Sequence, residues 1–199
     1  MKILIIGDSF AADWSIKYKN SLGWPNLLAQ QHDVLNLAQA RVGEYKIYKQ
    51  LCSIDVTNFD LVIVTHTSPY RVHSRSHPIH AFDCLHTNAD LIYNDIEYHG
   101  SRWKNIFNRS LQAARSWFVW HFDAEFQETL YELLVKRIHT MIGSTPCLTV
   151  ITPVSQVMLQ TPSVTILESE MLPNQCNHLS EKSNYKIYQE IQSFIHEFL

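Results

Sequence analysis

The most constraining feature of this sequence is its first nine residues, where an uninterrupted apolar run leads into a glycine and a serine. Residues 3–6 are four consecutive aliphatic side chains with no polar alternation, a pattern typical of a strand covered on both faces in a parallel sheet. Gly7 then permits a sharp backbone turn. Ser9 is therefore expected just past the carboxyl end of a central strand, where open α/β sheets bind their ligands.

The Gly-Asp-Ser tripeptide alone also fits an ordinary strand-to-helix turn. In that interpretation Asp8 or Ser9 caps the helix that follows. The functional interpretation needs a base elsewhere in the chain, placed at the same edge of the sheet.

Length and composition indicate a single globular domain. A chain of 199 residues with 46% apolar and 18% charged residues can form one complete α/β core. The net charge of -3 and the scattered basic residues predict no nucleic-acid partner. The four cysteines form no C-x-x-C pair, so we expect no structural zinc or redox motif. We also expect no cofactor and a cytoplasmic location with reduced thiols. No apolar stretch approaches the ~20 residues of a membrane helix, and we expect no membrane partner.

Further apolar runs alternate with amphipathic segments along the chain. Strands are expected at 33–37, 60–65, 147–152 and 164–167, and helices at 26–31, 45–51, 102–122, 124–142 and from 180 onwards. This alternation predicts a three-layer α/β/α sandwich with a mostly parallel, flavodoxin-like, five-stranded sheet. Residues 1–199 are expected to form one domain, with an inserted loop and helical region at about 70–122.

A base for Ser9 is available near the C-terminus. His178 lies in the sequence Asn-Gln-Cys-Asn-His-Leu-Ser that ends at Ser180, just before the last expected helix. In a doubly wound sheet that loop lies at the same carboxyl edge as Ser9. Because a serine nucleophile needs a base within hydrogen-bond reach, we predict that Ser9 and His178 form a catalytic pair.

With these segments identified, the chain resembles the SGNH (GDSL-type) hydrolases over its whole length, although on few residues. Gly7-Asp8-Ser9 matches the family's nucleophile block, residues 60–64 look like its third strand, and residues 177–180 look like its histidine block. The resemblance implies an α/β/α sandwich that needs no cofactor. It also implies hydrolysis of an acetyl or other acyl ester of a carbohydrate or small molecule.

The chain departs from the family at the residues that stabilise the oxyanion. A proline stands where the family has the asparagine of Gly-x-Asn-Asp. The resemblance then implies an oxyanion hole formed by Ser9, Gly43 and Ser68, with Arg71 as another donor or substrate contact. Ungapped counting places Arg41, instead of Gly43, at the family's glycine. Losing one such donor has cost roughly 2.7–4 kcal/mol where it was measured.

The second departure concerns the acid of the family's triad. Its position, three residues before the histidine, is Gln175 here, beside Asn174. We therefore predict a Ser-His dyad in which Asn174, Gln175 or Asp8 orients His178 or contacts the substrate. An Asp-to-Asn change in a chymotrypsin-type triad lowers kcat about 10⁴-fold, so slow turnover is expected.

Two other interpretations concern the sheet and the histidines. The same sheet fits a non-catalytic binding or interaction protein that keeps Gly-Asp-Ser for structural reasons.

Five histidines lie between residues 66 and 86, but no acidic ligand accompanies them at a recognisable interval. We interpret these as solvated loop histidines and predict no metal site.

Overall fold

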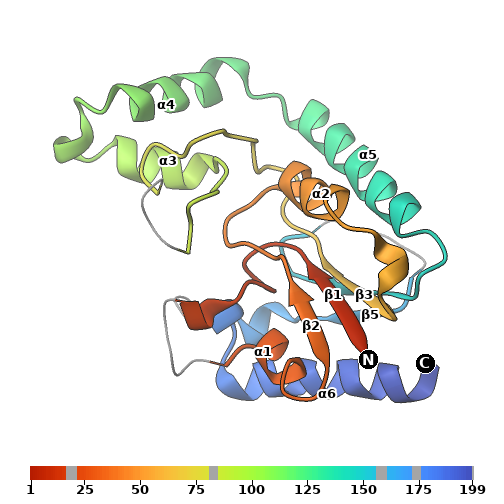
Figure 1. Ribbon diagram of the computed structural model, residues 1–199. Coiled ribbons are helices and arrows are strands. Elements are labelled where there is room, and N and C mark those ends of the chain that lie inside the picture. The colour runs from red at the N-terminus through yellow and green to blue at the C-terminus, as the bar shows by residue number, and fades with distance from the viewer. Residues whose placement is uncertain (17–21, 81–84, 156–160, 172–175, 199) are drawn as a thin grey trace.

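The computed structural model describes residues 1–16, 22–80, 85–155, 161–171 and 176–198. Within them, one sheet has the order β2-β1-β3-β4-β5, and every neighbouring pair is parallel (Figure 1). Its strands are β1 (Lys2–Ile6), β2 (Asp33–Asn36), β3 (Leu61–Thr65), β4 (Cys147–Ile151) and β5 (Ser163–Thr165). This is the order of a flavodoxin-like doubly wound sheet, which confirms the predicted fold class.

Helices cover both faces of the sheet (Figure 1). They are α1 (Trp24–Leu28), α2 (Glu44–Cys52), α3 (Tyr93–Gly100), α4 (Arg109–His121), α5 (Ala124–Ile142) and α6 (Glu181–Phe198). Short 3₁₀ helices lie at Trp14–Ile16 (η1), Val56–Asn58 (η2), Trp103–Asn105 (η3), Glu168–Glu170 (η4) and Cys176–His178 (η5). None of the described helices is long and apolar enough to cross a bilayer.

The alternation of side chains along β1 explains the three layers. Ile3 and Ile5 pack against α1 and α6, whereas Leu4 and Ile6 pack against α2 and α5. All four side chains are completely buried. A strand buried on both faces gains from apolar residues at every position, so the period-two pattern of a half-exposed strand is absent.

Gly7 ends β1 in a conformation that no other residue fits well. Its φ is +152°, and a Cβ added there would lie 1.8 Å from Thr65 Oγ1. The same hydroxyl accepts a 3.1 Å hydrogen bond from the backbone N–H of Asp8. The close approach of β1 and β3 therefore fixes the turn that carries Ser9.

The segment between β3 and α5 forms a subsidiary helical unit. α3 and α4 pack around a small apolar cluster of Ile96, Leu111 and Phe118, separate from the sheet cores. The expected helix over 102–122 is wrong in its first third. The side chain of Asn108 accepts a 3.1 Å hydrogen bond from the N–H of Leu111 and so caps α4. The chain turns before this cap because a capping asparagine starts a helix instead of continuing one.

Candidate active site

Ser9 and His178 meet at the carboxyl edge of the sheet. Ser9 Oγ lies 2.8 Å from His178 Nε2, within the range of a hydrogen bond between a nucleophile and its base. Ser9 follows the Gly7 turn after β1, and His178 ends η5, directly before α6. The two residues are 169 positions apart in sequence, and the parallel topology brings their loops together.

Asn177 locks the histidine loop onto the serine loop. Its Nδ2 donates to the backbone carbonyls of Ser9, at 3.3 Å, and Ala12, at 2.9 Å. Asn177 and His178 adopt left-handed φ values of 52° and 62°, which asparagine tolerates better than most residues. Sequence reasoning assigned no role to Asn177. Its place beside the histidine, in a segment that must turn into a helix, was the available signal.

Aromatic rings enclose the imidazole. The ring centroids of Phe10 and Trp14 lie 4.9 Å and 5.6 Å from that of His178. Trp14 Nε1 also donates a 3.0 Å hydrogen bond to the Ser9 carbonyl. These contacts restrict the orientation of the ring on the side where they pack, so the Ser9–His178 geometry does not depend on one hydrogen bond.

The surroundings of His178 favour its neutral form. Burial lowers the pKa of His178 from 6.5 to about 4, and the positive charges of Arg71 and Arg41 contribute in the same direction. The imidazole is therefore unprotonated at neutral pH and can accept a proton from Ser9. Asn174 and Gln175, the predicted orienting residues, lie outside the described part of the chain.

Asp8 is a buried carboxyl group with a backbone partner. It is fully buried, and its Oδ1 accepts a 3.0 Å hydrogen bond from the N–H of Phe10. Burial raises the pKa of Asp8 to about 6, against the opposing effect of the Arg71 charge. No hydrogen bond joins Asp8 to His178, both of which lie in the described residues. Asp8 stabilises the turn and does not orient the imidazole through a direct contact.

The predicted oxyanion donors Ser9 and Gly43 differ in whether the backbone N–H already donates a hydrogen bond. The backbone N–H of Ser9 donates to no residue that the structure describes, so it is available to a ligand. The N–H of Gly43 instead donates a 2.7 Å hydrogen bond to Asp90 Oδ2. Gly43 is therefore occupied in this arrangement, which corrects the expectation that its N–H faces the oxyanion. Arg41, the residue chosen by ungapped counting, has the left-handed φ of 64° that usually favours glycine.

Ser68 faces a cavity under the helical unit. Its Oγ accepts a 3.3 Å hydrogen bond from the N–H of Tyr70. Together with Tyr93, Phe118 and other residues it lines a cavity of about 540 Å³. Ser68, a predicted oxyanion donor, is thus placed at the wall of this cavity.

Arg71 carries unsatisfied donors close to His178. Its Nε and Nη1 atoms are buried and have no hydrogen-bond partner among the described residues. Burial lowers the pKa of Arg71, and the charge of Asp8 opposes that effect. A buried guanidinium donor without an acceptor is costly. A negatively charged oxygen brought to this position would remove the cost.

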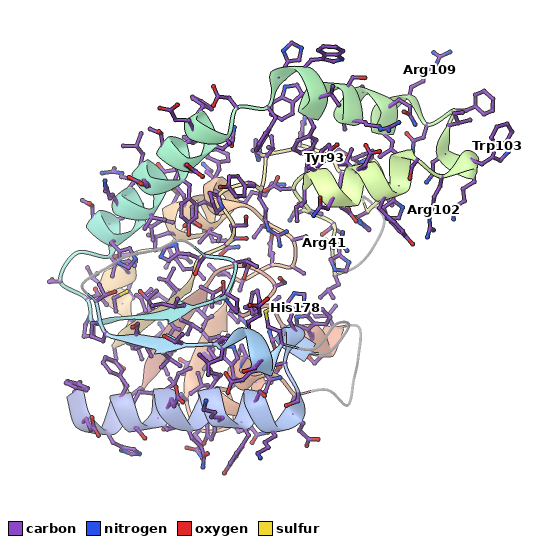
Figure 2. The ribbon with its side chains drawn as sticks, turned by 180° about the vertical axis from the view of Figure 1, so that it is seen from behind. Arg41, Tyr93, Arg102, Trp103, Arg109 and His178 are labelled. Atoms are coloured by element: carbon purple, nitrogen blue, oxygen red, sulfur yellow. The ribbon has the colours of Figure 1, made fainter. Side chains whose placement is uncertain are left out.

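A cluster of histidines and one carboxylate surrounds the side chain of Arg41, which lies near His178 in Figure 2. Arg41 Nη1 lies 2.6 Å from His80 Nε2 and 2.9 Å from Asp95 Oδ2. His77 Nε2 lies 3.4 Å from the same carboxylate oxygen, and His99 Nε2 lies 3.6 Å from Asp95 Oδ1. These contacts hold the guanidinium in place beside the candidate site.

This cluster corrects one interpretation of the sequence. His66 and His77 are 0% and 1% exposed, so they are not solvated loop histidines. Asp95, on α3, is the acidic partner that the local spacing did not reveal. The ligand atoms of His77, His80 and Asp95 lie within 4.8 Å of one another and could hold a metal ion. The guanidinium of Arg41 contacts His80 and Asp95 here, and the predicted absence of a metal site stays a prediction.

His66 belongs to a second buried chain of polar groups. Its Nδ1 lies 2.7 Å from Glu44 Oε1, and its Nε2 lies 3.1 Å from His139 Nε2. Burial, followed by the charge of His66, lowers the pKa of His139 to about 4. These contacts connect the end of β3 with α2 and α5.

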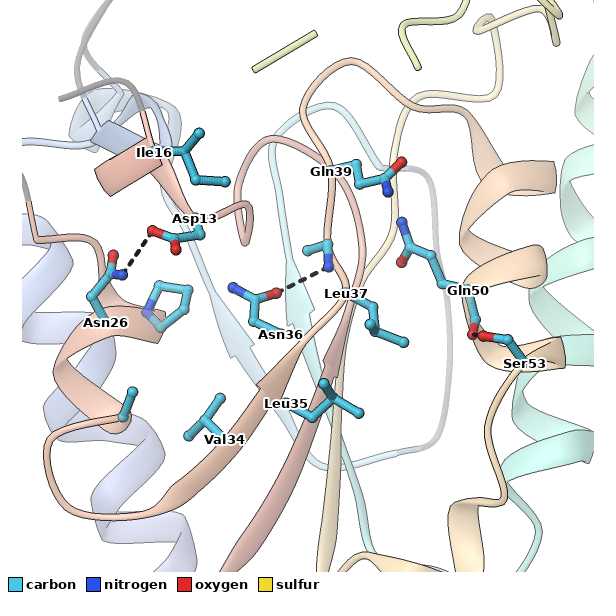
Figure 3. Close-up of a pocket in the computed structure, with 13 residues that line it drawn as sticks. Asp13, Ile16, Asn26, Val34, Leu35, Asn36, Leu37, Gln39, Gln50 and Ser53 are labelled. Atoms are coloured by element: carbon cyan, nitrogen blue, oxygen red, sulfur yellow. Dashed lines mark hydrogen bonds between the residues drawn. The ribbon is translucent and has the colours of Figure 1, made fainter. Parts of the chain in front are cut away.

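A further pocket lies along the edge strand β2, shown in Figure 3, and has a volume of about 650 Å³. Several of its polar side chains already take part in hydrogen bonds. Asn26 Nδ2 donates to Asp13 Oδ1 at 2.9 Å, and the Ala38 N–H donates to Asn36 Oδ1 at 3.0 Å. Ser9 and His178 are absent from its lining, so this pocket is separate from the catalytic candidates.

The buried histidines predict that the fold loses stability in mild acid. Burial lowers the pKa of His77, His139 and His178 from 6.5 to about 4. Between about pH 6.5 and pH 4, these histidines therefore bind protons in the unfolded chain but not in the folded chain. Stability that is fully present above pH 6.5 is lost as the pH falls through this window. Asp8 has a raised pKa and offsets part of the loss.

We expect Tm to fall by roughly 5–10 °C between pH 7 and pH 5 at constant ionic strength. Thermal unfolding followed by intrinsic fluorescence measures this change. The variant His77→Gln should show a flatter dependence, because one of the three groups no longer titrates. A Tm that is constant across the window would contradict the prediction.

Comparisons with known proteins find only distant structural similarity. No family model and no curated protein matches the sequence. A solved structure described as a lipolytic protein of the G-D-S-L family, from Desulfitobacterium hafniense DCB-2, is similar, with 14% identity, a TM-score of 0.45 and 98% of each chain covered. An extracellular lipase from Streptomyces rimosus has 14% identity and a TM-score of 0.38, over 96% of this chain and 71% of its own.

At these scores the two structures carry no argument about this chain. The first has the family name that the Gly-Asp-Ser motif suggested. Independently of both, this chain has the flavodoxin-like sheet order and the juxtaposed Ser9 and His178. Its fold is therefore a flavodoxin-like α/β fold.

Proposed function

We propose that this protein is a serine-dependent hydrolase that cleaves an acetyl or other acyl ester of a carbohydrate or small molecule through a Ser9–His178 dyad. The observation that carries the proposal is the 2.8 Å separation of Ser9 Oγ and His178 Nε2 at the carboxyl edge of the sheet. The neutral state of the imidazole supports the proposal, because only that form accepts the serine proton.

In the proposed reaction, Ser9 Oγ attacks the ester carbonyl carbon while its proton moves to His178 Nε2. The carbonyl oxygen becomes an oxyanion, held by the Ser9 N–H and the unpaired guanidinium donors of Arg71. When the tetrahedral intermediate collapses, the bond to the alcohol oxygen breaks and His178 protonates the leaving alcohol. Water, deprotonated by the same imidazole, then hydrolyses the acyl-serine and regenerates Ser9.

Covalent labelling by a fluorophosphonate tests whether Ser9 is activated. The probe forms a bond between Ser9 Oγ and phosphorus and releases fluoride. We expect one label per chain on Ser9, located by peptide mass spectrometry, and no label in Ser9→Ala. Ser110→Ala, which changes an exposed serine on α4, should label like wild type. If wild type remains unlabelled, the non-catalytic binding protein becomes the better interpretation.

The role of Arg71 leads to a second kinetic prediction. We expect Arg71→Gln to lower kcat for p-nitrophenyl acetate by about 10²–10³-fold with little change in KM, as for loss of an oxyanion donor. Arg75→Gln, which removes the charge of an exposed neighbour, should leave kcat unchanged. Equal kcat values for wild type and Arg71→Gln would show that Arg71 does not contact the oxyanion.

A further inference from the structure

The tip of the helical unit presents apolar side chains to solvent. We define the aromatic tip as Trp103, Ile106 and Phe107 with the basic residues Arg102, Lys104 and Arg109. Phe107 and Trp103 are 89% and 83% exposed, the highest values for large apolar side chains among the described residues. Figure 2 shows Trp103 at the outer end of this unit, with Arg102 and Arg109 on either side. Exposed apolar patches of this kind mark interaction surfaces.

Internal hydrogen bonds hold the backbone of the tip in this arrangement. Asn105 Nδ2 donates to the His99 carbonyl at 3.0 Å. Gln112 Nε2 donates to the carbonyls of Gly100 and Asn105, at 3.3 Å and 3.4 Å. The amide side chains of Asn105 and Gln112 therefore face inward, whereas the apolar side chains face outward. The local hydrogen bonds thus hold the tip backbone in a form that presents these apolar side chains to solvent.

The charge of the region is the opposite of that of the whole chain. Residues 98–122 contain four basic residues and no Asp or Glu, whereas the net charge of the protein is -3. One of the four, Arg115, pairs with Glu97 at 2.6 Å. Lys104 and Arg109 form no ion pair with any residue in the described part of the chain. The positive charge is therefore concentrated around the exposed aromatic side chains.

We propose that the aromatic tip docks this protein onto an anionic lipid surface. Tryptophan favours the membrane–water interface, and each Lys or Arg near an anionic surface strengthens binding by about fivefold. A convex tip with three apolar side chains can insert into fluid lipid without a complementary rigid surface. A second copy is a poorer occupant, because a two-fold contact would bring the same positive charges together.

The proposal revises the expectation that the protein has no membrane partner. That expectation followed from the lack of a spanning helix, which does not bear on peripheral binding. The proposal is independent of the Ser9 chemistry, since it concerns binding alone.

Co-sedimentation with sucrose-loaded vesicles tests the docking. We expect binding to vesicles of phosphatidylcholine with about 30% phosphatidylglycerol, at least tenfold weaker binding to pure phosphatidylcholine, and loss of binding in high salt. The double variant Trp103→Ser/Phe107→Ser should bind the anionic vesicles at least tenfold more weakly. Phe126→Ser/Leu133→Ser, which changes two side chains on α5 that are each 59% exposed, should bind like wild type.

Two results with vesicles would overturn the proposal: no binding to the anionic vesicles at low salt, or equal loss of binding in both double variants. If vesicles do not bind, tip-dependent binding of a single-stranded oligonucleotide would indicate a nucleic-acid partner instead. Tip-dependent dimerisation without vesicle binding would likewise overturn the proposal and indicate a second copy of the chain. Circular dichroism spectra matching wild type would show that the variants are folded, as expected for substitutions at exposed positions.

Discussion

Replacing His178 with alanine is expected to lower kcat/KM for p-nitrophenyl acetate by roughly 10²- to 10⁴-fold, the range that general acid–base catalysis contributes. The reason is that Nε2, 2.8 Å from Ser9 Oγ, is the proposed acceptor of the serine proton. Ser9→Ala should abolish turnover altogether. His121→Ala, at the exposed end of α4, is the matched control and should retain wild-type kinetics.

The pH profile gives this prediction a signature that a structural defect would not reproduce. Because the pKa of His178 is lowered to about 4, kcat/KM of the wild type should rise with pH through about 4. The rise should be largely complete one unit higher, in place of the usual rise near 6.5. Titration of Asp8, which has a pKa near 6, is expected to give a second inflection in the pH profile. Unchanged rates in His178→Ala, or an unchanged acid limb in that variant, would contradict the role of His178 as base.

Replacing Gly7 with alanine is expected to destabilise the fold by roughly 2–6 kcal/mol, combining backbone strain with overpacking. The added Cβ would lie 1.8 Å from Thr65 Oγ1 and 2.8 Å from the Thr65 carbonyl oxygen. The φ of +152° is also unfavourable for an L side chain. Because domains are stable by only about 5–15 kcal/mol, the variant should be poorly soluble or unfold at much lower urea concentration.

Urea unfolding followed by tryptophan fluorescence measures this loss. Gly100→Ala is the matched control, since the nearest atom to its Cβ would be Cδ of the flexible Arg115 side chain, at 3.1 Å. Its free energy of unfolding should change by less than about 1 kcal/mol. The further change Thr65→Ala should recover part of the stability of Gly7→Ala, because it removes the closest clashing atom. Equal midpoints for wild type and Gly7→Ala would show that the backbone relaxes without cost.

The site as a whole places its chemistry where several elements converge. Ser9 depends on the β1–β3 approach, His178 on the turn before α6, and Arg71 on the segment after β3. These contacts join parts of the chain that are far apart in sequence, so each catalytic group depends on a different supporting element. The predicted loss of kcat in Arg71→Gln measures a catalytic contact, whereas the predicted loss of stability in Gly7→Ala measures a contact that holds the fold.

The sequence by itself determined the sheet and the meeting of Ser9 with His178. Short apolar runs such as residues 3–6 and 61–64, bounded by turn residues, are typical of strands covered on both faces. The alternation of strands with helices then makes the sheet parallel. All carboxyl ends of parallel strands lie at one edge, so a serine after β1 and a histidine before α6 can be placed together without coordinates.

Only the tertiary structure decided which polar groups are free and which are paired. Gly43 has a suitable position in the sequence, but its N–H is taken by Asp90, 47 residues away. Asp95 joins His77 and His80 through the fold of α3, and the donors of Arg71 stay unpaired. Such pairings depend on loop conformation and burial, which leave no period in the sequence. The order of the elements follows from local patterns, whereas the partner of each buried polar group follows from the whole packed chain.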